Sequence, residues 1–203
     1  MTAVGIVVFD GAEELDFVGP WEVFTASAAL RAEAEVDGSA DDRVVLVAES
    51  SAPVRCAKGL RVLPDLTFAD VTALDVVVVP GGRGTRREVE NPLLLGWLRT
   101  VDATTTWTTS VCTGSFLLHA SKVAEGRRLA THWGSEDRLA ALGVDVVREA
   151  RFVRDGKVVS SQGVSAGIDM ALWVVGQLHS PVHARRVQRY IQYDPAPPYS
   201  ADI

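Results

Sequence analysis

The chain has 203 residues, 47% of them hydrophobic, which fits one well-buried domain over residues 1–203 and is short for two. A formal net charge of −6 at pH 7 argues against a nucleic-acid surface and against binding to an anionic membrane. The two cysteines, Cys56 and Cys112, lie far apart, the first residues lack a signal-peptide pattern, and no apolar run is long enough to span a bilayer, so we expect a cytoplasmic protein.

The first half of the chain predicts strands that alternate with helices. In chain order the pattern predicts a strand at 4–9, a helix from about 19 to 35, a loop at 36–42, a strand at 44–48, a hairpin at 53–64 and a strand at 76–79. Continuous apolar runs such as Val76 to Val79 are typical of strands buried on both faces. Pro20 stands at the favoured first position of its predicted helix, which places the cap at Gly19.

The second half continues the alternation. It predicts a helix from Asn91-Pro92 through Leu98, a strand at 104–109, helices at 116–120 and 135–142, a hairpin at 151–160, and helices at 167–178 and 181–193. The tail, residues 194–203, is proline-rich and is expected to lie extended on a surface. Arg185, Arg186 and Arg189 are expected to form a solvated face of the last helix.

This order of elements predicts an α/β sandwich with a mostly parallel sheet and helices on both faces. In such sheets the ligand crevice lies beyond the carboxyl ends of the strands. Three segments reach that edge: the loop after Phe9, the turn Pro80-Gly81-Gly82, and Cys112. Their convergence predicts a site for a small-molecule substrate.

Cys112 stands where a strand turns sharply into a helix. Such a turn holds a nucleophile clear of the backbone and points its sulfur at the N–H groups that open the helix. Those dipoles favour the thiolate, the reactive form of cysteine. Position alone equally fits a small buried residue, because free cysteines are often buried.

Asp16 is the candidate acidic partner. The predicted cap at Gly19 makes Asp16 too early for a capping role, and it lies between the apolar residues Leu15 and Phe17. A carboxyl group held in such surroundings has a raised pKa and can act as an acid or a hydrogen-bond donor. A solvated acid is the alternative interpretation.

Gly81, Gly82 and Thr113 are candidates for binding a developing negative charge. Glycines often end buried strands for structural reasons, but they also free backbone N–H groups to face an anion. The amide of Thr113 is a candidate second donor, and its hydroxyl is expected beside the sulfur. Thr113 equally fits a role in starting the helix.

Among the four histidines, His132 is the best placed to approach the site, although a buried structural role fits it equally well. Ser180-Pro181 separates His179 from His183, so we reject a two-histidine metal face. Cys56 falls in a hairpin without a helix behind it and is interpreted as structural. Gly81-Gly82-Arg83-Gly84 lacks the spacing of a phosphate or dinucleotide loop, and we expect no metal and no cofactor.

The chain resembles the DJ-1/PfpI superfamily over essentially its whole length. The matching segments are 10–20, Val79-Pro80-Gly81-Gly82, Val111-Cys112-Thr113-Gly114-Ser115, Thr131-His132-Trp133, 163–169 and 193–198. The last three segments are similar to the isonitrile hydratase-like branch. That branch is also similar to the N-terminal domains of some AraC-type regulators.

The resemblance implies a flavodoxin-like α/β sandwich, usually a homodimer. It implies a cofactor-free hydratase that adds water to an isonitrile and gives an N-substituted formamide. It places the nucleophile on Cys112, the acid on Asp16, and an oxyanion-binding pocket on Gly82 and the Thr113 amide. PfpI-type peptidases have histidine directly after the cysteine, and DJ-1-like glyoxalases have glutamate at the position of Asp16, so these activities fit less well.

Two alternatives to the hydratase remain open. One is a related cysteine enzyme, either a glyoxalase or deglycase or a redox-responsive protein. The other is a non-catalytic ligand-binding module related to the regulator domains.

Overall fold

The structure is a computed structural model of the chain and describes residues 1–35 and 42–197. The strands are β1 (Ala3–Val7), β2 (Arg43–Ala48), β3 (Val54–Arg55), β4 (Arg61–Val62), β5 (Leu66–Thr67), β6 (Val76–Val79), β7 (Trp107–Val111), β8 (Phe152–Asp155) and β9 (Val158–Ser161). The helices are α1 (Glu14–Glu33), α2 (Thr85–Glu88), α3 (Pro92–Asp102), α4 (Gly114–Ala120), α5 (Glu136–Ala140), α6 (Ala166–Leu178) and α7 (Pro181–Tyr190). A 3₁₀ turn, Trp133–Ser135, precedes α5.

Seven strands form one sheet in the order β5-β2-β1-β6-β7-β9-β8. All neighbours pair in parallel except β8 and β9, which form the predicted hairpin. The five strands β2-β1-β6-β7-β9 follow the flavodoxin-like order, in which the direction of strand addition reverses at the β1–β6 pair. The predicted fold class is confirmed. Strands β3 and β4 form the separate hairpin that was predicted at 53–64.

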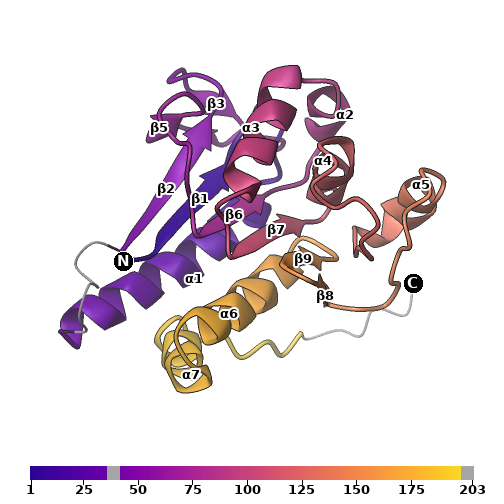
Figure 1. The fold of residues 1–203 in the computed structure, drawn as a ribbon. Coiled ribbons are helices and arrows are strands. Elements are labelled where there is room, and N and C mark those ends of the chain that lie inside the picture. Colours follow the sequence, from indigo (N-terminus) through magenta and orange to yellow (C-terminus); the bar gives the residue numbers. More distant parts are fainter. Residues whose placement is uncertain (36–41, 198–203) are drawn as a thin grey trace.

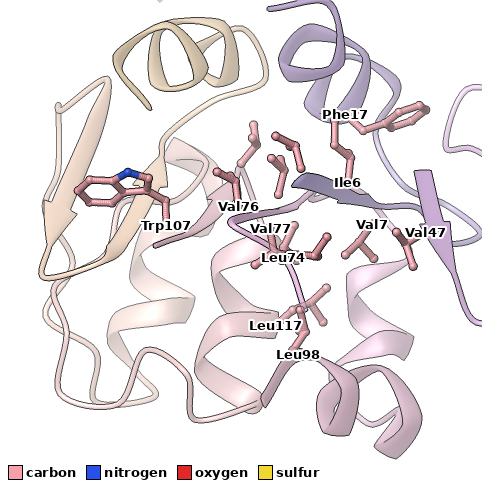
Figure 2. Packing of buried hydrophobic residues seen from close by; sticks show 14 of the residues in the cluster. Ile6, Val7, Phe17, Val47, Leu74, Val76, Val77, Leu98, Trp107 and Leu117 are labelled. Atoms are coloured by element: carbon pink, nitrogen blue, oxygen red, sulfur yellow. The ribbon is translucent and has the colours of Figure 1, made fainter. Parts of the chain in front are cut away.

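Helices cover both faces of the sheet (Figure 1). Helices α1, α6 and α7 lie together on one face, and α2, α3 and α4 lie on the other. Ile6 and Phe17 fill the first interface, and Leu98 and Leu117 fill the second (Figure 2). All four side chains are at most 1% exposed, because residues of a buried strand or helix face must interdigitate on both sides.

The predicted start of the first long helix is wrong. Helix α1 begins at Glu14, so Pro20 lies inside the helix rather than at its first position. Because Pro20 has no N–H, the carbonyl of Asp16 lacks the hydrogen bond that a helix normally forms to the residue four positions later. Tertiary contacts support the early start, because Glu13 N donates to Gly81 O at 2.9 Å and ties the helix to the sheet edge.

Smaller differences concern the ends of elements. The strand predicted at 104–109 is β7, Trp107–Val111, and the last helix ends at Tyr190 rather than near residue 193. Ser135 stands at the N-cap of α5 without a side-chain cap bond, and α5 ends at Ala140. The two short elements β5 and α2 were not predicted. The predicted loop at 36–42 lies outside the described residues except for its last residue, and so does 198–203 of the tail.

No helix in residues 1–35 and 42–197 combines the length and the apolar character needed to cross a membrane.

Candidate functional site

Cys112 forms a strained turn between β7 and α4. Its φ is +55°, in the left-handed region that costs a non-glycine residue about 1 kcal/mol or more. Its amide donates to Ser161 O of β9 at 3.1 Å, which keeps the residue in register with the sheet. Cys112 is 6% exposed, so its sulfur is almost enclosed at the edge of the sheet.

The surroundings hold this turn in place. The carbonyl of Cys112 accepts hydrogen bonds from Thr131 Oγ1 at 3.0 Å and from Ser115 Oγ at 3.2 Å. Gly114 is required by close approach, since a side-chain carbon there would lie 2.1 Å from Val79 O. The turn is therefore fixed from three sides: by β9, by the 131 segment and by the end of β6.

Asp16 lies in the first turn of α1 with 0% exposure. Its Oδ2 accepts a hydrogen bond from the Gly81 amide at 2.8 Å. Its Oδ1 is buried and has no fully formed hydrogen bond among the described residues. The structure thus brings Asp16, Gly81 and Cys112 together from α1, β6 and β7, as the convergence at the sheet edge predicted.

Asp16 and Cys112 influence each other's protonation. Burial is the main cause that raises the pKa of Asp16 to about 7, against the Gly81 bond and the contact with Cys112, which lower it. Burial also raises the pKa of the Cys112 thiol to about 12, and the charge of Asp16 adds to the rise. Between these two values the pair holds one proton, which the carboxyl oxygen and the sulfur can share.

The helix start favours the thiolate, as expected, but burial of the sulfur outweighs this effect. The Thr113 amide does donate to the sulfur and lowers the pKa of Cys112, as predicted for a helix start. Desolvation exceeds this effect, because α4 has only seven residues and the sulfur is nearly enclosed. The thiol therefore needs Asp16 as a proton acceptor, which gives the acid a more direct role than the sequence predicted.

The hydroxyl of Thr113 organises the glycine turn. The Gly82 amide donates to Thr113 Oγ1 at 3.0 Å, and Thr85 Oγ1 lies 3.2 Å from the same oxygen. Gly82 itself has φ +114°, and a side-chain carbon there would lie 2.4 Å from Gly11 O. Only glycine fits this position.

This network corrects the predicted anion-binding pocket. The Gly81 amide is bound to Asp16 and the Gly82 amide is bound to Thr113, so neither is a free donor in the structure. Both glycines position side chains of the site instead. The Thr113 amide is the backbone donor that meets the sulfur.

The structure does not bring His132 into a hydrogen bond with Cys112 or Asp16. Its Nδ1 accepts from the Gly134 amide at 3.2 Å, and its ring lies 5.5 Å from that of Trp133. The preceding residue, Thr131, contacts the Cys112 carbonyl instead. Sequence reasoning missed Thr131 and Thr85, because a hydroxyl that supports a turn from a distant segment leaves no local pattern.

The other candidates lie away from the site. Cys56 is buried in the β3–β4 turn, and burial raises its pKa to about 11. The rings of His179 and His183 lie 5.4 Å apart, and His183 Nε2 is 2.8 Å from Ser27 Oγ, which joins α7 to α1. Within the described residues, no group of three or more His, Cys, Asp or Glu side chains is arranged to hold a metal ion.

We expect Cys112 to be alkylated well before Cys56 at neutral pH. Asp16, with a pKa of about 7, can accept the Cys112 proton, and the Thr113 amide stabilises the sulfur anion. Burial raises the pKa of Cys56, and the charges of Glu14 and Asp10 add to the rise. Mass spectrometry of a timed iodoacetamide reaction measures both rates, and equal rates would contradict this role of Asp16.

Comparison with known proteins places this geometry in context. A sequence profile described as the DJ-1/PfpI family matches residues 2–177. An isonitrile hydratase from Pseudomonas putida is 36% identical over 198 residues, which cover 98% of this chain and 81% of that protein. The glutathione-independent glyoxalase DJR-1.2 from Caenorhabditis elegans is 28% identical over 141 residues, 68% of this chain and 75% of that protein.

A solved structure is similar over the whole chain. The crystal structure of a ThiJ/PfpI family protein from Pseudomonas syringae has a TM-score of 0.88 and 31% sequence identity. The match covers 100% of this chain and 80% of that chain.

Proposed function

The chain belongs to the DJ-1/PfpI family, and on that premise we propose that it is a cofactor-free hydratase that converts isonitriles to N-substituted formamides. Cys112 is the proposed nucleophile and Asp16 the proposed acid and base. The similarity to an isonitrile hydratase over 98% of the chain supports the substrate class. The buried Cys112–Asp16 pair, which holds one proton above about pH 7, is the observation that carries the chemistry.

In the first step Asp16 takes the proton of the thiol, and the sulfur attacks the terminal carbon of the isonitrile. A carbon–sulfur bond forms as one carbon–nitrogen π bond breaks, and Asp16 gives its proton to that carbon. The product is a thioimidate on Cys112, and Asp16 is again a carboxylate. Asp16 Oδ1 has no fully formed hydrogen bond within the described residues and is the oxygen that we assign to this proton transfer.

In the second step Asp16 takes a proton from water as the water oxygen attacks the thioimidate carbon. The same proton passes to the nitrogen, and the carbon–sulfur bond then breaks. The hydroxyl proton returns to the pair as the formamide leaves, so the sum is one isonitrile and one water to one formamide. The Thr113 amide stabilises the sulfur as it departs, and Thr113 Oγ1 holds the Gly82 turn beside it.

The direct test is formamide production from a small alkyl isonitrile by the purified chain without added metal. Chromatography detects the formamide, and mass spectrometry of the intact chain detects the thioimidate on Cys112. Absence of formamide with several isonitriles would contradict the proposed function.

The pH dependence of kcat/KM should show the pKa of Asp16. That pKa is raised from 3.8 to about 7, so below pH 7 both members of the pair are protonated and no base remains for the thiol. We expect kcat/KM to fall by roughly tenfold per pH unit below about pH 6.5. A profile that stays flat between pH 5 and 8 would contradict the shared-proton pair.

A related cysteine enzyme is the second candidate, and the similarity to the glyoxalase DJR-1.2 favours it specifically. Glyoxalase chemistry needs the same reactive thiol and an acid that moves protons on a dicarbonyl. Turnover of methylglyoxal without formamide production would select this candidate. An intact site that turns over neither substrate would select the third candidate, a ligand-binding module.

We also propose that residues 1–203 act as one cytoplasmic domain that assembles into a homodimer. Exposed apolar side chains on α1, Leu15, Val18 and Trp21, are each 38–39% exposed and offer a surface for such an assembly. Light scattering at micromolar concentration should give twice the mass of the 21.8 kDa chain. A mass of one chain would contradict the dimer.

A further inference from the structure

The carbonyl group of Cys112 is held by two side-chain hydroxyls that come from different parts of the fold. Thr131 Oγ1 donates to this oxygen at 3.0 Å from a segment 19 residues away. Ser115 Oγ donates to it at 3.2 Å from the first turn of α4. Both side chains are 0% exposed, so water does not compete for these bonds. Neither step of the proposed mechanism uses either hydroxyl.

The peptide unit that joins Cys112 to Thr113 carries this carbonyl at one end and the Thr113 N–H at the other. Because a peptide unit is planar and trans, its C=O and N–H groups point in opposite directions. The carbonyl points toward Thr131 and Ser115. The N–H contacts the sulfur on the other side as its backbone donor. A hydroxyl that fixes the carbonyl end therefore also fixes the direction of the N–H.

One strand, β9, secures both peptide units that flank Cys112. The Cys112 amide, in the preceding unit, donates to Ser161 O at 3.1 Å. Ser160 Oγ accepts the Ala130 amide at 2.8 Å and so holds the residue just before Thr131. The relative orientation of the two units sets φ and ψ of the residue between them, so these contacts keep Cys112 at φ +55°. A strained residue keeps such a conformation only where its surroundings fix it.

The bond at the carbonyl also strengthens the donor at the other end of the unit. A hydrogen bond to the oxygen polarises the amide, and successive bonds in a buried chain reinforce one another by roughly 10–30% each. The chain here runs from the Thr131 hydroxyl through the peptide unit to the sulfur. It favours negative charge on the sulfur once the proton has passed to Asp16, so position and polarisation act in the same direction.

We propose that Thr131 is a positioning residue for Cys112. Its hydroxyl aims the Thr113 N–H at the sulfur through the Cys112 carbonyl, and the Ser115 hydroxyl supports it. This inference deepens the proposed function and rests on it, because it concerns the nucleophile of that mechanism. It applies to both steps in which the sulfur carries negative charge, the attack on carbon and the departure from the intermediate.

Thr131→Val and Thr109→Val form a matched pair that tests this role. Thr109 is also 0% exposed, and its Oγ1 donates to a backbone carbonyl, that of Val77, at 2.9 Å. Valine keeps the shape of threonine and removes the donor, so both variants should lower the melting temperature to a similar extent. Only Thr131→Val should slow alkylation of Cys112 by iodoacetamide, by roughly tenfold, which is part of the roughly 10²–10³-fold cost of losing a whole oxyanion donor.

The pH dependence of this alkylation separates positioning from a general loosening of the fold. The titratable groups that act on the sulfur are Asp16 directly and Glu14 through Asp16, and every variant keeps both. Thr131→Val should therefore keep the midpoint of the profile at about pH 7 and lower only its plateau. Thr131→Ser keeps the hydroxyl and should hold the plateau within a few-fold of the parent.

Steady-state kinetics with a small alkyl isonitrile give a second measure. Because Thr131 acts on the sulfur through the backbone, Thr131→Val should lower kcat and kcat/KM by the same factor and leave KM unchanged. A raised KM at parental kcat would contradict the positioning role.

Alkylation needs no turnover, so it tests this inference apart from the proposed function. A parental plateau in Thr131→Val, an equal loss in Thr109→Val, or a Thr131→Ser plateau as low as that of Thr131→Val would overturn the inference. If Thr131→Val does not fold, Ser115→Ala removes the second bond to the same carbonyl and should lower the plateau several-fold; an unchanged plateau there would also overturn it. A lower plateau in Thr131→Val, with no formamide from the parent, keeps the positioning role and refutes the hydratase alone.

Discussion

Cys112→Ala should abolish formamide production, with turnover at least about 10³-fold below the parent. The sulfur forms the covalent intermediate in the proposed mechanism, and no other cysteine can replace it. Cys56, the other thiol, lies buried in the β3–β4 turn and is not part of the site. Formamide assays and detection of the thioimidate by mass spectrometry measure the loss.

Cys56→Ala is the matched control, and it should keep parental turnover. The Cys112→Ala chain should also remain folded, because the turn is held through backbone atoms. Its carbonyl bonds to Thr131 and Ser115 and its amide bond to Ser161 do not involve the sulfur. Residual turnover within tenfold of the parent in Cys112→Ala would refute the covalent mechanism.

The sheet and the location of the site could be predicted because their causes are local. A continuous apolar run such as Val76 to Val79 identifies a buried strand, and the carboxyl ends of parallel strands meet at one edge. The sharp turn at Cys112 follows from a strand pattern and a helix pattern that meet at one residue. Glycines at 81, 82 and 114 then indicate where backbone must come close to other atoms.

The start of α1 could not be predicted by the same reasoning. Pro20 has a strong local preference for a first helical position, but the contacts of Glu13 and Ala12 with the Gly81-Gly82 turn begin the helix six residues earlier. Those contacts join segments about 70 residues apart. The error affected the interpretation of Asp16, which lies in the first turn of α1 rather than before the helix.

The protonation states of Cys112 and Asp16 could not be predicted from a local sequence pattern either. A helix start favours a thiolate, but the extent of desolvation depends on how completely other segments cover the sulfur. Likewise, the Gly82 amide could be named as a donor from its position, whereas its acceptor, Thr113 Oγ1, depends on a side-chain rotamer. Hydrogen-bond partners across the fold decide which donors remain free for substrate.

Asp16→Asn should reduce turnover by roughly 10²-fold or more, because asparagine cannot take the thiol proton or return it to carbon. Asparagine keeps the size of the side chain and an oxygen that can accept the Gly81 amide. The pKa of Cys112 should fall in this variant, since the charge of Asp16 and its contact with the thiol both raise that pKa. The pH dependence of iodoacetamide alkylation measures the change, and a higher pKa would contradict it.

Stability gives an independent measure of the buried carboxyl. Because the folded-state pKa of Asp16 is about 7 against 3.8, the folded chain binds a proton between these pH values that the unfolded chain does not. Stability therefore falls as pH rises through this window, by at most about 4 kcal/mol from this group. Asp16→Asn lacks the titration, so its melting temperature should exceed the parent's at pH 8, and the difference should shrink toward pH 4. Turnover by Asp16→Asn within a few-fold of the parent would refute Asp16 as the acid and base of the site. A melting temperature of Asp16→Asn below the parent's at pH 8 would refute the buried, titrating carboxyl.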